Sequence, residues 1–105
     1  MCYNRLRLKI VRHLRKLVDF DWDENNIDHI SRHSVLPEEA EEALLDPRRM
    51  SIPARKNAIE PRRAVLGATE NGRILFVVFV NRRDLVRVVT ARDATFKEKQ
   101  RYKRR

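Results

Sequence analysis

Arginine side chains are concentrated in the second half of the sequence, where a glutamate and a tyrosine follow them. A guanidinium group grips two phosphate oxygens at once, so such a cluster suits the chemistry of phosphodiesters. RNA supplies its own nucleophile, the 2′-hydroxyl, and its cleavage then needs a base, an acid and fixed cations around the developing negative charge. The residues behind this hypothesis are Arg62, Arg63, Arg73, Arg82, Arg83, Arg87 and Arg92, followed by Glu98 and Tyr102.

Arg87 differs from the other arginines because it lies inside an apolar segment, LVRVVTA (85–91). A charge in such a segment is costly unless it is paired or faces water. Strict strand alternation places Arg87 and Arg92 on opposite faces, so they share a site only if the strand ends or bulges between them. The alternative for each single arginine is an ordinary surface charge or an ion pair.

Two histidines lie four residues apart in HISRH (29–33), which places them on one face of a helix. Zinc peptidases use such a pair with a glutamate directly after the first histidine. Ile30 occupies that position here, and no third ligand is evident, so we predict no metal and no cofactor. His29 is interpreted as a solvent-facing residue, and His33 as a residue that caps carbonyl groups or donates a proton.

Other catalytic classes are disfavoured by the composition. With only Gly67 and Gly72, the chain has no phosphate-binding glycine loop, and its few serines show no nucleophile elbow. The single Cys2 excludes an internal disulfide framework and a multi-cysteine zinc site. No apolar run approaches the roughly 20 residues that span a bilayer.

The net charge of +9 over 105 residues is unevenly distributed. Residues 1–18 carry six Lys/Arg and no acid, whereas residues 19–46 carry ten acids and one arginine. Basic residues again exceed acidic ones in 47–105. We infer one basic surface suited to phosphates and one acidic surface that repels them. The alternative is an arginine-rich genome, which gives arginine-rich surfaces of no particular function.

The first 18 residues fit both a basic amphipathic helix and a strand. Such a helix would suit a membrane surface, but packing on its own domain is the commoner outcome, and we expect no membrane partner. No apolar h-region of a secretory signal follows the basic start, so a cytoplasmic location is expected.

The first half of the chain is predicted to form a short edge strand and two helices. Residues 17–22 alternate between apolar and acidic side chains, which favours the strand. A helix over 23–33 begins at the N-cap Asp23. The second helix begins at Pro37 and ends before Pro47.

Three antiparallel strands follow a proline-rich loop at 47–61. The middle strand contains ILFVVFV (74–80), which is apolar at every position and is therefore predicted to be covered on both faces. Asn71-Gly72 fits a type I′ turn, in which both central residues have positive φ. The three strands are predicted over residues 62–69, 73–81 and 85–91.

A capping box from Thr95 to Glu98 opens a last helix, which runs to the C-terminus. Beyond Phe96 and Tyr102 this helix has almost no apolar residues, so it is either solvated or completed by a partner. The predicted order is strand, two helices, three antiparallel strands and helix. This order indicates an α+β fold with an antiparallel β-meander, an N-terminal helix pair and a C-terminal helix.

Four segments, in order, resemble the BrnT toxins of bacterial type II toxin–antitoxin systems. FDWDENNIDHISRH (20–33) is similar to that family's opening F-x-W-D motif and first helix, and VLPEEAEEALLDP (35–47) to its second helix. RRAVLGATENGRILFVVFV (62–80) resembles its paired strands, and VRVVTARDATFKEKQRY (86–102) its most specific block. The match covers about residues 19–105, the expected toxin domain, and leaves residues 1–18 as a basic N-terminal extension.

The resemblance implies a RelE-like fold and a metal-independent endoribonuclease that inhibits translation. It also implies a BrnA-like antitoxin with a ribbon-helix-helix DNA-binding part, which neutralises the toxin as a dimer or heterotetramer. A departure is Leu36, where the family usually has a Ser or Thr helix cap. The alternative is a non-catalytic RNA- or protein-binding module of the same fold, either a degenerate toxin or a member of a similar domain family of less certain function.

The resemblance also identifies candidate catalytic residues by motif position. Arg62, Arg87 and Arg92 are assigned to phosphate contact, and Glu98, Tyr102 or His33 to proton transfer. The other basic side chains near the predicted sheet are assigned to RNA binding, namely Arg63, Arg73, Arg82, Arg83 and Lys97.

Overall fold

Most predicted elements are present in the structure, a computed structural model that describes residues 18–53 and 62–105. The expectations for residues 1–17 and 54–61, within the basic extension and the proline-rich loop, lie outside the described residues. The described chain forms β1 (Asp19–Phe20), α2 (Glu24–Ser31), α3 (Pro37–Leu44), β2 (Met50–Ile52), β3 (Arg63–Ala68), β4 (Ile74–Arg82), β5 (Leu85–Asp93) and α4 (Phe96–Lys103).

The described strands form one mixed sheet in the order β1-β5-β4-β3-β2. β1 runs parallel to β5, whereas the other neighbours are antiparallel. The α+β class is as predicted, but the sheet is mixed and contains one strand more than expected. That strand, β2, pairs with β3 from within the segment predicted to be a loop. Three residues between prolines are too few to display a strand period.

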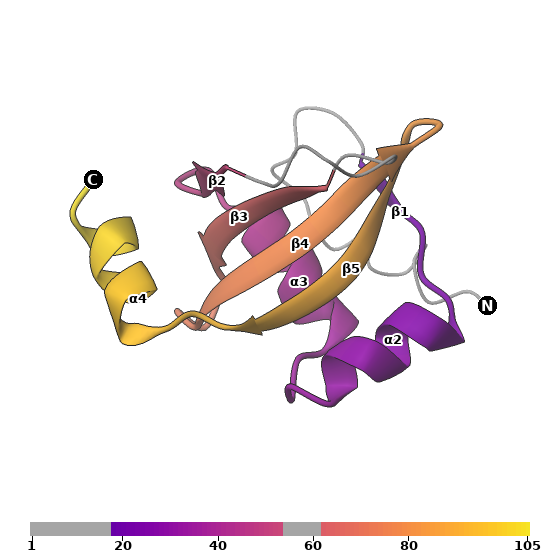
Figure 1. Ribbon diagram of the computed structural model, residues 1–105, viewed down its shortest axis with the longest axis horizontal. Coiled ribbons are helices and arrows are strands. Elements are labelled where there is room, and N and C mark those ends of the chain that lie inside the picture. The colour runs from indigo at the N-terminus through magenta and orange to yellow at the C-terminus, as the bar shows by residue number, and fades with distance from the viewer. Residues whose placement is uncertain (1–17, 54–61) are drawn as a thin grey trace.

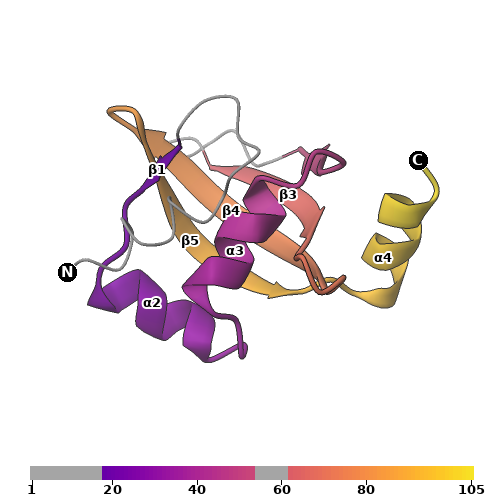
Figure 2. The same cartoon turned by 180° about the vertical axis from the view of Figure 1, so that it is seen from behind.

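α2 and α3 cover one face of the sheet, and α4 lies beyond its end, next to β3 (Figures 1 and 2). The main core lies between these two helices and the sheet and includes Ile30, Ala40 and Val77, all fully buried. A smaller apolar cluster surrounds Leu66 and Ile74 on the opposite face, near α4. β4 contributes to both clusters, in agreement with its unbroken apolar sequence.

Gly67 allows α3 to pack directly against β3. A Cβ atom at Gly67 would lie 2.0 Å from the carbonyl oxygen of Ala43 and 2.7 Å from its carbonyl carbon. No side chain fits between backbones at that distance, so the glycine sets how close the helix lies to the sheet.

A β-bulge in β5 changes which side chains share a face. Val78 of β4 pairs with Thr90, whereas the next residue, Phe79, pairs with Val88. Val89 is therefore an extra residue in β5, and the alternation of side chains is interrupted there.

The bulge brings Arg87 and Arg92 to the same face of the sheet. Arg87 pairs with Val80 and Arg92 with Phe76, and these two partners are four residues apart on the regular strand β4. The bulge that a shared site of Arg87 and Arg92 requires is thus present. We call this face, which carries Leu66, Phe76, Val80, Arg87 and Arg92 and is turned away from α3, the outer face; it is in front in Figure 1.

The prediction of a type I′ turn at Asn71-Gly72 was wrong. Only Gly72 of that pair has positive φ, at 87°, and its N–H donates to the carbonyl of Thr69 at 2.9 Å. The chain forms a three-residue loop here instead of a two-residue turn. Both central residues have positive φ in the second hairpin, where Arg83 is at 47° and Asp84 at 69°.

Helix ends follow the cap residues of the sequence. The Asp23 side chain accepts hydrogen bonds from the N–H groups of Asn25 and Asn26, and Thr95 forms the predicted capping box with Glu98. Leu36 provides no side-chain cap. Among the described residues, no helix is long and apolar enough to span a membrane.

Candidate functional site

A hollow of about 320 Å³ lies at one end of the outer face, beside Arg87. Three elements meet there: the start of α2, the end of β4 and the first half of β5. Three arginines, one histidine and two asparagines contribute to its wall, so it could bind a polyanion. The lining residues are Asn25, Asn26, His29, Arg62, Val80, Arg82, Arg87, Val88 and Val89.

Two carboxylates hold the Arg87 guanidinium at this hollow. Its Nη1 lies 3.0 Å from Asp23 Oδ2 and 3.4 Å from Asp21 Oδ2, and its Nη2 donates to Asp23 Oδ1 at 3.3 Å. The Arg87 side chain is only 18% exposed, and these two carboxylates compensate the charge that the apolar strand segment would otherwise leave unpaired. Arg87 lowers the pKa of the Asp23 carboxyl, and hydrogen bonds from the backbone of α2 add to that effect.

Asn26 joins the start of α2 to the edge of β5. Its side chain is almost fully buried; Nδ2 donates to the carbonyls of Asp21 at 2.9 Å and Val88 at 3.1 Å, and Oδ1 accepts from the Asp23 N–H at 2.8 Å. Val86, two residues before Val88, accepts from the Asp21 N–H of the β1 ladder. The side-chain amide of Asn26 thus makes the hydrogen bond to Val88 that a further residue of β1 would make in the ladder with β5. Asn26 was not among the predicted site residues, although its position three residues after the N-cap is that of a capping-box partner.

His29 is exposed on α2, as predicted, and it also lines the hollow. Its ring centroid lies 6.0 Å from that of His33, one helical turn further on. His33 is exposed at the corner after α2, where its carbonyl lies 3.5 Å from Arg73 Nη2. Within residues 18–53 and 62–105, no group of three or more His, Cys, Asp or Glu side chains could hold a metal ion.

Arg92 and Glu98 lie at the other end of the outer face, roughly 15 Å from Arg87 by strand rise. The pair is bidentate, with Nη1–Oε1 at 2.9 Å and Nη2–Oε2 at 3.2 Å, and the guanidinium lies 4.3 Å from the centre of the Phe76 ring. Glu98 also accepts from the Thr95 N–H. Arg92 lowers the pKa of Glu98, against a smaller opposing effect of burial. This pair ties α4 to β5.

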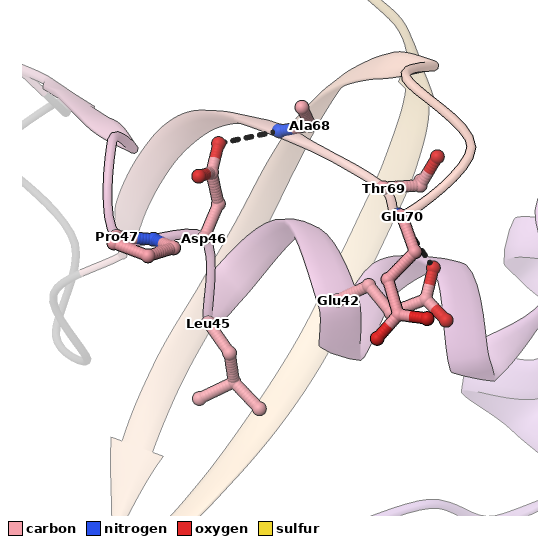
Figure 3. A pocket seen from close by; sticks show the side chains of 7 residues that line it. All are labelled: Glu42, Leu45, Asp46, Pro47, Ala68, Thr69 and Glu70. Atoms are coloured by element: carbon pink, nitrogen blue, oxygen red, sulfur yellow. Dashed lines mark hydrogen bonds between the residues drawn. The ribbon is translucent and has the colours of Figure 1, made fainter. Parts of the chain in front are cut away.

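Tyr102 forms a second tie between α4 and the body of the protein. Its hydroxyl donates to Asp46 Oδ2, which also accepts from the N–H of Ala68 at 2.8 Å. Burial and this carboxylate raise the pKa of Tyr102 to about 12. Asp46 lies beside a hollow of about 210 Å³ at the end of α3 (Figure 3), whose wall includes Glu42 and Glu70. This second hollow does not share a lining residue with the first.

The side chain of Arg73, one of the candidate RNA-binding residues, is held by contacts within the protein. Its Nε donates to Asp93 at 2.7 Å, and its Nη1 donates to Glu39 and to the carbonyl of Ser34, both at 2.9 Å. Asp93, and to a lesser extent Glu39, raise the pKa of Arg73. These contacts favour a structural role, because they join the start of β4 to the α2–α3 corner.

The predicted site residues therefore lie in several places. Arg62, Arg82 and Arg87 meet at the first hollow. Arg92 and Glu98 connect β5 to α4, and Tyr102 connects α4 to Asp46 after α3. Arg63, Arg83 and Lys97 are exposed, with Arg83 at the tip of the β4–β5 hairpin and Lys97 on α4.

One comparison with known proteins gave a match. Residues 22–98 match the family described as "Ribonuclease toxin, BrnT, of type II toxin-antitoxin system". No curated protein matched the chain.

Proposed function

The chain belongs to the BrnT family of type II toxin–antitoxin ribonuclease toxins, and on that premise we propose that it is an endoribonuclease whose active site is the hollow beside Arg87. The supporting observation is the meeting of Arg62, Arg82, Arg87 and His29 around one hollow. Guanidinium groups and an imidazole are the groups that phosphodiester cleavage by an internal nucleophile needs.

In the proposed reaction the 2′-hydroxyl of RNA attacks the adjacent phosphorus. The P–O bond to the 5′-oxygen of the next nucleotide breaks, and a cyclic phosphate and a free 5′-hydroxyl result. His29 accepts the proton of the 2′-hydroxyl or delivers one to the leaving 5′-oxygen, since imidazole can do either. In each case water exchanges the second proton, so that the reaction releases no net proton. Arg62 and Arg87 bind the phosphate oxygens as negative charge develops. The arginines supply the positive charge, so the reaction does not use a metal.

Glu98, Tyr102 and Arg92 receive different roles in this proposal from those that the family resemblance implied. Glu98 is engaged with Arg92, and its lowered pKa makes it a weak base. Tyr102, with a pKa of about 12, holds its proton too tightly to be an effective acid at neutral pH. We propose that all three residues hold α4 in place.

The cellular role follows from the toxin family. We propose that cleavage of RNA in the cytoplasm inhibits translation, and that a BrnA-like antitoxin with a ribbon-helix-helix part neutralises the toxin. A RelE-like arrangement of the sheet is part of the same proposal. The acidic helices α2 and α3 lie on the far side of the sheet from the outer face, so RNA and antitoxin need not compete for one charged surface.

The test is cleavage of a single-stranded RNA oligonucleotide by the purified protein in buffer containing EDTA. We expect His29→Ala to lower the cleavage rate roughly 10²- to 10⁴-fold, and Arg87→Ala roughly 10²-fold or more. Arg32→Ala is the matched control, because the Arg32 side chain is 70% exposed and forms an ion pair with Asp28 away from the hollow. Wild-type rates for both site variants would refute this site.

The alternative function, RNA binding without cleavage, is favoured by one observation. Arg87 and Arg92, which share the outer face, are both paired with carboxylates, so their charge is partly neutralised before RNA arrives. This alternative predicts retention of intact RNA, with an affinity that falls steeply as salt rises. Cleavage products that depend on His29 would exclude it.

A further inference from the structure

Asp23 has two sets of contacts that no other carboxylate near the hollow combines. Its Oδ1 accepts from the N–H groups of Asn25 at 2.9 Å and Asn26 at 3.1 Å, so the N-terminus of α2 holds it in place. Its two oxygens also face Nη1 and Nη2 of Arg87. A carboxylate fixed by a helix is thus bound to the end of an arginine fork.

The contact leaves one edge of the guanidinium available. A guanidinium has five N–H groups, and those of Nε and the outer Nη2 form an edge that matches two phosphate oxygens. Asp23 occupies the opposite end, between Nη1 and Nη2. Arg87 Nε makes no hydrogen bond with any residue in the described ranges 18–53 and 62–105.

A hydrogen bond links the two elements that carry this ion pair. Asn26 joins α2 to the carbonyl of Val88, the residue after Arg87. The backbone that carries Asp23 and the backbone that carries Arg87 are therefore connected within one residue of the guanidinium.

The sign of the charges argues against a simple role in binding RNA. Asp21 and Asp23 place negative charge within 3.4 Å of Arg87, and this charge repels a phosphate. A carboxylate at this position lowers affinity, and its benefit must come from orienting the guanidinium for the transition state.

We infer that Asp23 is a positioning residue, which directs the Nε edge of Arg87 towards the scissile phosphate in the hollow. This inference rests on the proposed function. It explains why the acidic residue of the F-x-W-D segment stands beside a cationic site.

The experiment uses Asp23→Asn, because asparagine caps helices as well as aspartate does. The fold is therefore retained while the negative charge that faces Arg87 is removed, and thermal unfolding checks this. With a single-stranded RNA oligonucleotide, we expect kcat to fall about tenfold or more, while KM stays the same or falls because a repulsive charge is lost. Asp28→Asn is the matched control, since Asp28 is an exposed acid of α2 that forms an ion pair with Arg32 and does not line the hollow.

A double-mutant cycle with Arg87→Ala completes the experiment. If Asp23 acts through Arg87, Asp23→Asn adds no further loss of kcat in the Arg87→Ala background. Additive losses, or a wild-type kcat for Asp23→Asn beside an inactive Arg87→Ala, would overturn the positioning role and leave the proposed function standing. A higher kcat/KM in Asp23→Asn would also overturn it, because Asp23 would then only mask Arg87. Wild-type activity of Arg87→Ala would overturn the positioning role, and wild-type activity of both Arg87→Ala and His29→Ala would refute the proposed function as well.

Discussion

Arg87 and Arg92 are paired with carboxylates in similar ways, yet their surroundings give them different capacities. Arg92 places both Nη atoms on Glu98 and its flat face on Phe76, which leaves little of the group for a ligand. Arg87 stands at the wall of a hollow with an edge directed away from its carboxylates. The free edge of the guanidinium, rather than the presence of an ion pair, separates a ligand-binding arginine from a structural one.

Gly67 carries a stability prediction at the scale of one residue. Its replacement by alanine would place a Cβ 2.0 Å from the carbonyl oxygen of Ala43, so α3 must move away from β3. We expect Gly67→Ala to lower the free energy of unfolding by about 3 kcal/mol, the upper range for overpacking. Urea unfolding measures this loss.

Gly72→Ala is the control for that experiment. A Cβ at Gly72 meets nothing within 4 Å, but its φ of 87° is unfavourable for alanine. Its expected cost is about 1 kcal/mol, from backbone strain alone. Equal losses for the two variants would show that close packing of α3 is not the reason for Gly67.

α4 is held by side-chain contacts with the rest of the protein rather than by a core of its own. None of its residues is buried, and Phe96 is 74% exposed. Eight residues are too few for a stable isolated helix. Its position is therefore set by the Arg92–Glu98 pair and by the bond from Tyr102 to Asp46.

Tyr102→Phe tests this dependence at the scale of the helix. Loss of the hydroxyl removes one tie, so the amides of α4 should exchange hydrogen faster, while those of β4 keep their protection. Hydrogen exchange followed by mass spectrometry measures both segments. Arg101→Ala, which alters an exposed residue of the same helix, should leave the exchange unchanged. Unaltered exchange in Tyr102→Phe would mean that the remaining contacts suffice.

Elements with a strong local signal were predictable from the sequence, and those decided by pairing were not. Asp23, Thr95 and the apolar run of β4 each specify their structure through nearby residues. β2 exists only because β3 offers it an edge, and the bulge at Val89 has no sequence signature. The bulge nevertheless decides that Arg87 and Arg92 share a face, so the composition of the candidate site could be predicted but not its geometry.

Charge is separated across the whole molecule. The segment 19–46, with ten acids and one arginine, supplies β1 and the helix layer, whereas the arginines of the hollow belong mainly to β3, β4, β5 and their ends. The two kinds of surface predicted from the sequence thus correspond to two layers of the fold. His29 and Asp23 are exceptions, because α2 reaches the hollow along the edge of β5. This contact between layers is why a site based on strand arginines alone was incomplete.

The same ionic contacts predict how stability depends on pH for the molecule as a whole. The folded state lowers the pKa of Asp23, Asp93 and Glu98, each mainly through an arginine partner. A lowered pKa contributes stability that is present above the ordinary value, 3.8 for Asp and 4.5 for Glu, and is lost as pH falls through the folded value. Tyr102 behaves in the opposite sense. Its pKa rises from 10.0 to about 12, so its contribution is present below pH 10 and disappears between about pH 10 and 12.

We therefore expect a plateau in the free energy of unfolding between about pH 5 and pH 9.5, with a decline on each side. Urea unfolding across this range measures it. Glu98→Gln should make the acid decline shallower, because one of the carboxyl groups that take up a proton on unfolding is gone. Tyr102→Phe should make the alkaline decline shallower. It should also make the acid decline slightly shallower, because the Tyr102 hydroxyl is one of the groups that lower the pKa of Asp46. An alkaline decline of wild-type size in Tyr102→Phe would show that the bond to Asp46 does not stabilise the folded protein, and the docking of α4 would then rest on Arg92 and Glu98.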